Sequence, residues 1–250
     1  DRAAFFLHGD EPMAEPDMIR YRDLVTKRGE RIPLQHLTGE QEFMGLDFHV
    51  NEHVLIPRQD TECLVERVLP YVDGKRVLDV CTGSGCILLS LLLELPQALG
   101  TGVDVSEGAL CVAKENRKRL GLEQRAELIQ SDLFSADYFR KNSGNDHMEY
   151  DMLISNPPYI RTEDIEGLME EVRFHDPVLA LDGKENGLYF YEKITEQAGT
   201  YLKPGGWLMY EIGCDQGMDV SEIMKKNGFE QIEIKKDLAD IKNAGKALYD

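Results

Sequence analysis

From Asp60 onward, short apolar runs alternate with segments of helical spacing, and this alternation limits the fold more than any other feature of the chain. Seven runs have the length and apolar content of strands: residues 77–80, 102–105, 126–130, 152–155, 207–212, 231–235 and 246–249. Helical patterns fall between them. Strands that alternate with helices predict an α/β fold with a doubly wound, mainly parallel, seven-stranded sheet. Ligands bind such sheets at the carboxyl ends of the strands.

The first fifty or so residues follow another pattern. Residues 17–28 have helical spacing, and Pro33 and Gly39 then punctuate a loop. Partial alternation in residues 43–50 predicts a β-hairpin. This is too little apolar sequence for a separate core, so we expect it to pack on the main domain.

These patterns predict three parts. Residues 1–38 form a small N-terminal helical region, residues 39–56 a β-hairpin linker, and residues 57–250 the main α/β domain. We expect the side chain of Asp60 to cap the first helix of the main domain, which reaches Leu69.

The chain is strongly acidic, with a net charge of −18 at pH 7. Affinity for nucleic acid comes largely from Lys and Arg side chains that neutralise phosphates, so this charge argues against stable binding to DNA or RNA. It is compatible with a protein partner that has a basic surface. Solubility alone is the simpler explanation of the acidity.

The cysteines, histidines and apolar runs indicate a cytoplasmic protein without a metal site. The five cysteines lack CxxC spacing and the six histidines lack paired spacing, which predicts reduced thiols and no zinc. The longest apolar run, from Cys86 to Leu95, is about half the length of a membrane span and predicts a buried helix. The first residues lack the pattern of a signal peptide. We expect a monomer with no membrane association.

A loop with two glycines, Asp79-Val80-Cys81-Thr82-Gly83-Ser84-Gly85, follows the first strand of the main domain. Glycines let the backbone approach a ligand closely, and the helix that follows offers free N–H groups at its start. The alternative is an ordinary tight turn. A dinucleotide site would need a third glycine at the start of the helix, where this chain has apolar residues, and this disfavours a nicotinamide-dependent dehydrogenase.

Acidic residues end the second and third strands. Asp104, beside Val105, lies about twenty residues past the glycine loop, where a carboxylate can accept hydrogen bonds from both hydroxyls of a ribose. Asp132 can accept an adenine amino group while Leu133 packs on the ring, and capping of the next helix is the alternative. Three consecutive strand ends thus predict one continuous site along the edge of the sheet.

The fourth strand ends in Asn156-Pro157-Pro158-Tyr159. The prolines lack N–H groups and have a fixed φ, so the turn is stiff. The side-chain oxygen of Asn156 and the carbonyl of Pro157 can each accept one N–H of the same planar amino group, and Tyr159 can cover the π-face of that group. This pattern predicts a clamp for a nitrogen nucleophile, against the alternative of a proline-rich loop.

Several motifs resemble those of known methyltransferases. The glycine loop resembles the motif of class I S-adenosylmethionine-dependent enzymes, although Cys81 stands where that class usually has glycine. Residues 33–43, residues 55–62 with Pro57-Arg58-Gln59-Asp60-Thr61-Glu62, and residues 155–160 with the later 172–177 resemble the release-factor glutamine methyltransferases, the PrmC/HemK family. The resemblance covers residues 20 to 235, roughly.

The resemblance implies a Rossmann-like class I methyltransferase fold and an activity. The enzyme would transfer a methyl group from S-adenosyl-L-methionine, which leaves S-adenosyl-L-homocysteine, to N5 of the glutamine in the Gly-Gly-Gln loop of peptide-chain release factors. The roles that it implies fall on two groups of residues. The substrate amide would be held by Asn156, Pro157, Pro158, Tyr159 and Arg58, the first two and Tyr159 being catalytic. The cofactor would be held by Asp79, Cys81, Thr82, Gly83, Ser84, Gly85, Asp104, Val105, Asp132, Leu133 and Asn156. For Arg58, a purely structural salt bridge is an equal alternative.

Other functions suit some of these residues. An N6-adenine methyltransferase, or another amino-group methyltransferase, would use the same Asn-Pro-Pro-Tyr clamp on an exocyclic amine. The charge of −18 counts against a DNA substrate. A cofactor-binding partner of the translation machinery without catalytic activity is a hypothesis of a different class.

Overall fold

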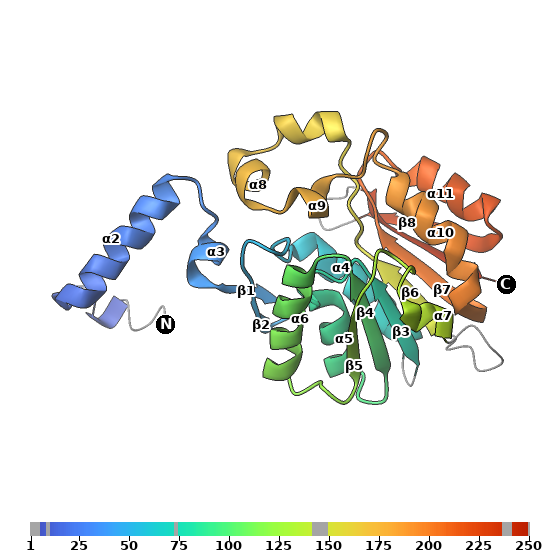
Figure 1. Cartoon of the computed structure of the whole chain (residues 1–250), viewed down its shortest axis with the longest axis horizontal. Coiled ribbons are helices and arrows are strands. Elements are labelled where there is room, and N and C mark those ends of the chain that lie inside the picture. The colour runs from blue at the N-terminus through green and yellow to red at the C-terminus, as the bar shows by residue number, and fades with distance from the viewer. Residues whose placement is uncertain (1–5, 9–10, 73–74, 142–149, 237–241, 250) are drawn as a thin grey trace.

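The structure is a computed structural model that describes residues 6–8, 11–72, 75–141, 150–236 and 242–249 (Figure 1). Its centre is a seven-stranded sheet in the order β5-β4-β3-β6-β7-β9-β8. The strands are β3 (Arg76–Val80), β4 (Leu99–Asp104), β5 (Ala126–Gln130), β6 (Tyr150–Ser155), β7 (Leu202–Glu211), β8 (Phe229–Lys236) and β9 (Lys242–Tyr249). From β5 to β7 neighbouring strands are parallel, and β9 is antiparallel to both β7 and β8. The predicted α/β fold with a mainly parallel sheet is confirmed.

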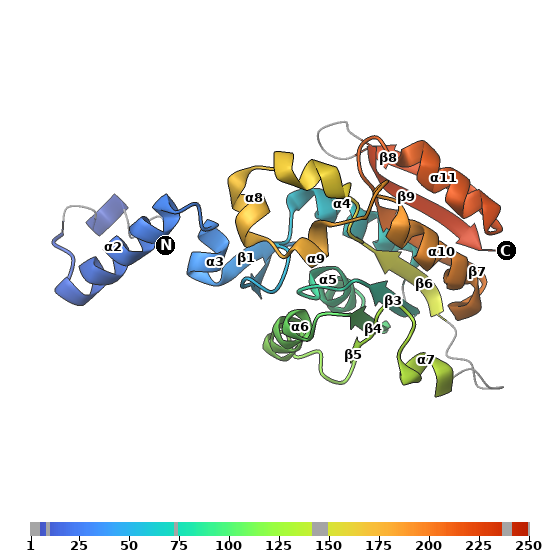
Figure 2. The ribbon, with the colours of Figure 1, turned by 45° about the horizontal axis from the view of Figure 1, so that its top comes forward.

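Helices cover both faces of the sheet (Figures 1 and 2). One face carries α4 (Gln59–Val68), α5 (Cys86–Glu94) and α6 (Glu107–Arg119), and the other carries α7 (Asp137–Lys141), α10 (Tyr189–Tyr201) and α11 (Gly217–Lys226). None of the helices within the described ranges is long and apolar enough to cross a bilayer.

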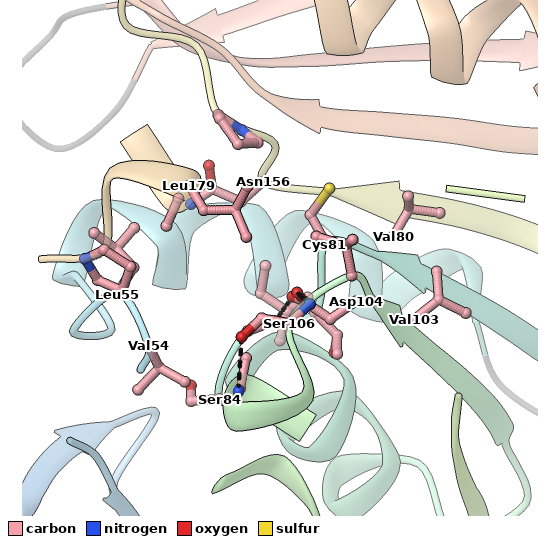
Figure 3. Close-up of a pocket in the computed structure, with 18 of the residues that line it drawn as sticks. Val54, Leu55, Val80, Cys81, Ser84, Val103, Asp104, Ser106, Asn156 and Leu179 are labelled. Atoms are coloured by element: carbon pink, nitrogen blue, oxygen red, sulfur yellow. Dashed lines mark hydrogen bonds between the residues drawn. The ribbon is translucent and has the colours of Figure 1, made fainter. Parts of the chain in front are cut away.

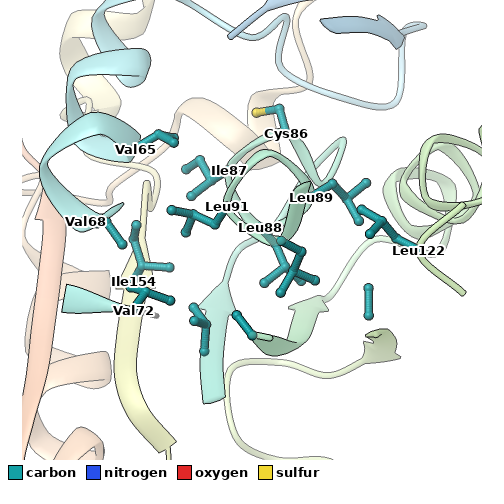
Figure 4. Packing of buried hydrophobic residues seen from close by; sticks show 14 of the residues in the cluster. Val65, Val68, Val72, Cys86, Ile87, Leu88, Leu89, Leu91, Leu122 and Ile154 are labelled. Carbon is teal, nitrogen blue, oxygen red and sulfur yellow. The ribbon is translucent and has the colours of Figure 1, made fainter. Parts of the chain in front are cut away.

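Two apolar cores separate these layers, because successive strand residues point to opposite faces. In β6, Met152 and Ile154 belong to the core beneath α4 to α6, and Leu153 belongs to the core beneath α10 and α11. Figure 4 shows the first core, in which Leu88 and Leu91 of α5 are fully buried. Burial of one such leucine contributes about 2 kcal/mol. Apolar residues on both sides of each strand explain the continuous apolar runs in the sequence.

The N-terminal part consists of α2 (Glu15–Gly29), α3 (Leu34–Thr38) and a hairpin of β1 (Glu40–Phe43) and β2 (Leu46–His49). Both views show α2 away from the sheet, and α2 has no buried residue. The hairpin packs on the main domain through fully buried Phe43 and Phe48, whereas α2, which we expected to pack there as well, buries no residue.

The predicted loop between Pro33 and Gly39 is wrong, because the chain forms the short helix α3 there and ends it at Gly39 with a φ of 79°. The predicted cap is also wrong. The first helix of the main domain begins at Gln59 with Arg58 at the cap position, two residues before the predicted cap, which places Asp60 inside its first turn. An acidic side chain there still favours the helix through the helix dipole.

The segment between β6 and α10 contains helices that the sequence patterns did not predict. They are α8 (Glu170–His175), α9 (Val178–Leu181) and the 3₁₀ turn at Thr162–Gly167. Each is too short to show a full apolar period, so pattern alone cannot find it. This segment also reaches the N-terminal region, because Arg28 at the end of α2 forms a 2.6 Å ion pair with Glu171 of α8.

Candidate active site

A cavity opens at the carboxyl ends of β3, β4, β5 and β6, where a doubly wound sheet places its ligands. In Figure 3, Asn156 and Leu179 lie on one side of the cavity, and Asp104 and Ser106 lie on the other. The lining residues come from the glycine loop, the ends of β4 and β5, the Asn156 turn, α9, Phe190, the linker from His53 to Arg58, and the starts of α4, α5 and α6, including Thr61. The cavity is therefore built by segments from most of the chain.

The glycine loop adopts backbone angles that favour glycine at three positions. Gly83 and Gly85 have φ of 55° and 80°, and Gly85 directly precedes α5. Cys81 has φ of 62°, which costs a residue with a Cβ roughly 1 kcal/mol relative to glycine. The chain therefore keeps the left-handed backbone at this position without the residue that suits it best.

The thiol of Cys81 lines the cavity and stays protonated. Burial raises its pKa well above the ordinary value, and the nearby carboxylates of Asp104 and Asp79 raise it further. A neutral thiol is a poor nucleophile and a poor metal ligand, so Cys81 acts here as a small apolar residue.

Asp79 lies behind the loop and does not line the cavity. Its Oδ2 accepts a 2.6 Å hydrogen bond from the hydroxyl of Thr82. Burial raises the pKa of Asp79 to about 7, and Asp104 adds to the rise while the Thr82 bond opposes it. The contact fixes the loop from within.

Asp104 lines the cavity with its carboxylate anchored on the backbone. Oδ2 accepts from the N–H of Gly83 and Oδ1 from the N–H of Ser106, both at 2.9 Å. Burial raises the pKa of Asp104, and these two bonds oppose the rise. Each carboxylate oxygen has a second lone pair, so the group can still accept hydrogen bonds from a ligand.

Val105, Asp132 and Leu133 continue the lining at the ends of β4 and β5. Leu133 has φ of 50° and is half-buried, and the side chain of Asp132 is exposed. The hydroxyl of Ser131, rather than Asp132, accepts the N–H of Ala136 in the turn before α7. Thr82, Gly83 and Ser84 line the cavity as well, so the structure brings these strand-end residues into one place.

Only part of the Asn156-Pro157-Pro158-Tyr159 turn lines the cavity. Asn156 and Pro158 line the cavity, and Pro157 and Tyr159 are not among its lining residues. The hydroxyl of Tyr159 donates to Oε1 of Glu211 at 3.3 Å, and burial, with Glu211 next, raises the pKa of that hydroxyl. The expected place of Tyr159 over a substrate amide remains a prediction.

One residue outside the predicted site, Thr61, holds Asn156, and a second, Glu211, holds Thr61. The Nδ2 group of Asn156 donates to Oγ1 of Thr61 at 3.4 Å, and Thr61 donates to Oε2 of Glu211 at 2.6 Å. Thr61 stands in the motif at residues 55–62, and Glu211 is a carboxylate at the end of β7, after its apolar residues. The sequence alone could have indicated Glu211, because it is an acid at the end of an apolar strand, as Asp104 is.

Arg58 both lines the cavity and pairs with Asp176 through Nη2 and Oδ2 at 3.2 Å. The Asp176 side chain is 3% exposed and that of Arg58 is 44% exposed. Burial raises the pKa of Asp176 to about 6, and the Arg58 charge and hydrogen bond oppose this rise. The structural role of Arg58, which the sequence left open, is thus observed, and its role toward a substrate remains a prediction.

Among the residues that the structure describes, no group of three His, Cys, Asp or Glu side chains is arranged to hold a metal ion. Cys63 and Cys86 are buried as free thiols, and Cys111 and Cys214 are exposed.

The fold and the cavity define a methyltransferase domain, and comparison with known proteins agrees. A family model described as a methyltransferase domain matches residues 72–246, and one described as the PrmC N-terminal domain matches residues 1–39. A solved methyltransferase from Pyrococcus furiosus shares the fold, with a TM-score of 0.61, 18% identity, and coverage of 89% of this chain and 98% of the other.

Comparison with curated relatives identifies the family to which this methyltransferase domain belongs. The release factor glutamine methyltransferase of Clostridium acetobutylicum is 41% identical over 242 residues, which cover 96% of this chain and 83% of the relative. That of Geobacter sulfurreducens is 42% identical over 230 residues, with 92% and 78% covered. The chain belongs to the release factor glutamine methyltransferase family.

Proposed function

We propose that this protein transfers a methyl group from S-adenosylmethionine to the side-chain amide nitrogen, N5, of the glutamine in the Gly-Gly-Gln loop of peptide-chain release factors. One observation carries the proposal: Asn156 shares a single cavity with the glycine loop and the strand-end acids Asp104 and Asp132. The names and identities of the curated relatives support the same substrate class.

The side chains around the cavity fit S-adenosylmethionine. Asp104 offers anchored carboxylate oxygens to ribose hydroxyls, and Asp132 with Leu133 offers an acceptor and an apolar surface to an adenine. The loop from Cys81 to Ser84 and Val105 would complete the contact, while Gly85 turns the chain into α5 and Asp79 supports the loop through Thr82. When bound, the cofactor supplies an electrophilic methyl group on a sulfonium.

The chain's own residues would bind and orient the nucleophile. Amide nitrogen is a weak nucleophile because its lone pair is delocalised into the carbonyl. Acceptors at Asn156 Oδ1 and the Pro157 carbonyl would hold its two hydrogens and so fix its direction, and Tyr159 would shape the pocket. Such positioning is the main contribution that a site without a strong base can make.

The three parts of the chain would have different roles in holding the partner and in catalysis. We assign residues 1–38 to a region that helps to hold the release factor, residues 39–56 to the linking hairpin, and residues 57–250 to the catalytic domain. The net charge of −18 suits a protein partner with a basic surface better than a nucleic acid. We expect a monomer that acts in the cytoplasm.

The direct test is a methylation assay read by mass spectrometry. The protein and S-adenosylmethionine are incubated with an unmethylated release factor, and the Gly-Gly-Gln peptide is fragmented. One added methyl group on the glutamine is expected. Cofactor binding without methylation of this peptide would contradict the proposed substrate and point to another amine, such as adenine N6. Binding of the release factor without any turnover would point to a scaffold.

A further inference from the structure

The ends of β6 and β7 place two polar side chains together. The two strands are parallel neighbours with Ser155 opposite Tyr210, so Asn156, which directly follows β6, lies beside Glu211, the last residue of β7. Thr61, in the first turn of α4, joins them from the layer above. Thr61 is 3% exposed and Glu211 is 4% exposed, so water has little access to these contacts.

The chemistry of the three groups fixes which of them donates. An ionised carboxylate only accepts, and Glu211 accepts the hydroxyl hydrogens of Thr61 at 2.6 Å and of Tyr159 at 3.3 Å. Burial raises the pKa of Glu211, and these two hydrogen bonds oppose that rise. A hydroxyl has one hydrogen, so Thr61 can only accept from its other neighbour. That neighbour is the Nδ2 group of Asn156 at 3.4 Å.

The direction of these bonds sets the orientation of the Asn156 amide. Because Nδ2 of Asn156 donates to Thr61, Oδ1 is the side-chain atom that can accept a hydrogen bond from another partner. Asn156 lines the cavity, so that partner can be a bound substrate. The reversed amide would place its NH₂ group against the NH₂ group of a substrate amide, donor against donor, and would place its oxygen against the lone pairs of the Thr61 hydroxyl.

We propose that Thr61, held by Glu211, is a positioning residue that presents Oδ1 of Asn156 to the amino group of the substrate. This inference rests on the proposed function, because it concerns how the same cavity holds its nucleophile. Thr61 lines the cavity itself, and its proposed effect passes through Asn156, whose Oδ1 it holds as a fixed acceptor where the substrate nitrogen is oriented.

The test compares Thr61→Val, which keeps the shape of the side chain and removes the hydroxyl, with Thr61→Ser, which keeps the hydroxyl. Thr195→Val is the matched control, because Thr195 is also a buried threonine with a hydrogen-bonded hydroxyl, but its partner is Tyr210 and, unlike Thr61, it does not line the cavity. Each variant is assayed for kcat, KM for the release factor, the Kd of S-adenosylmethionine and the Tm.

We expect Thr61→Val to lower kcat at least roughly 10-fold, since misplacement of a reacting group by about 1 Å can cost ~10²-fold. The Kd of the cofactor should stay within about twofold, Thr61→Ser should restore most of kcat, and Thr195→Val should keep the wild-type kcat. If Thr61→Val does not fold, Thr61→Ala removes the same hydroxyl and serves instead. A hydroxyl-free variant with the wild-type kcat, or a loss equal to that of Thr195→Val, overturns the proposal.

A second measurement, of the contact between Asn156 and Thr61, does not depend on the methylation assay. In ¹⁵N spectra of the free protein, the side-chain NH₂ resonances of Asn156 should shift in Thr61→Val and remain in place in Thr195→Val. If the wild-type protein leaves the release factor unmethylated, the proposed function fails, and these resonances still decide the inference. A shift confined to Thr61→Val supports the positioning contact, and unchanged Asn156 resonances overturn it.

Discussion

The side chain of Asn116 pairs with both backbone groups of His49. Its Oδ1 accepts the His49 N–H at 2.7 Å, and its Nδ2 donates to the His49 carbonyl at 3.0 Å. The same Nδ2 donates to the carbonyl of Ser84 at 3.0 Å. Asn116 is buried in α6, so one amide ties the end of the β-hairpin to the glycine loop.

We expect Asn116→Ala to lower the free energy of unfolding by about 3 kcal/mol, because it leaves three backbone groups, two half-buried at His49 and one buried at Ser84, without this partner. It should also weaken the binding of S-adenosylmethionine, since the glycine loop loses a support. Urea denaturation and calorimetric titration measure the two effects. The control is Lys118→Ala on the exposed face of the same helix, expected to change stability by less than about 0.5 kcal/mol. Equal stability of the two variants would contradict this role of Asn116.

Strands such as β6 could be predicted from the sequence because they have apolar residues on both faces. Residues 126–130 form β5 with the predicted bounds, and Cys86 begins α5 as predicted. β7 was predicted to begin at residue 207, but it begins at Leu202 and passes through Pro204 and Gly205. Leu202 pairs with Tyr150 of β6 and Trp207 pairs with Met152, so residues 203–206 form an irregularity between two paired positions, and such pairing between distant segments leaves no local pattern.

The site was predictable to the extent that it lies at strand ends. Asp104, Asp132 and Asn156 each follow an apolar run, and a parallel sheet brings such positions to one edge. Thr61 and Asn116 reach the site from helices, so only tertiary packing shows what they contact. The left-handed backbone of Cys81 was equally hidden, because its residue type gives no sign of a positive φ.

The backbone of Cys81 predicts an unusual order of stability for two substitutions. At a position with φ of 62°, Cys81→Gly should be more stable than Cys81→Ala by about 1 kcal/mol. At an ordinary helical site the order is reversed, and Lys114, exposed in α6, supplies the control: Lys114→Ala should be more stable than Lys114→Gly by about 1 kcal/mol. Chemical denaturation of the four variants tests both orders. If the Ala variant were more stable than the Gly variant at both positions, the backbone at Cys81 would be unstrained.

Asn156→Ala should abolish most turnover and leave the cofactor bound. The substitution removes the acceptor that faces the cavity, and loss of one preorganised polar group at a reacting centre costs ~10²-fold or more in kcat. Single-turnover methylation of the release factor and titration with S-adenosylmethionine separate the two effects. Asn227→Ala, at the end of α11 and outside the cavity lining, is the control with unchanged turnover. Normal turnover in Asn156→Ala would rule out the clamp.

The pairing of Arg58 with Asp176 predicts a dependence of stability on pH. Burial raises the pKa of Asp176 from 3.8 to about 6, with Arg58 and His175 both opposing the rise. The native protein therefore binds this proton more tightly than the unfolded chain, so the contribution of Asp176 to stability is full below pH 3.8 and is lost as the pH rises toward 6.

Replacing Arg58 removes the largest opposing charge, so the pKa of Asp176 should rise further and the loss should continue above pH 6. We expect the stability difference between the wild type and Arg58→Met to be small at pH 4 and larger at pH 8, measured as free energies of unfolding in urea at each pH. Adding Asp176→Asn to both proteins should remove the pH-dependent part of this difference, because the amide cannot ionise. A difference that is independent of pH would show that Arg58 stabilises the fold by packing alone, without acting on the Asp176 carboxylate.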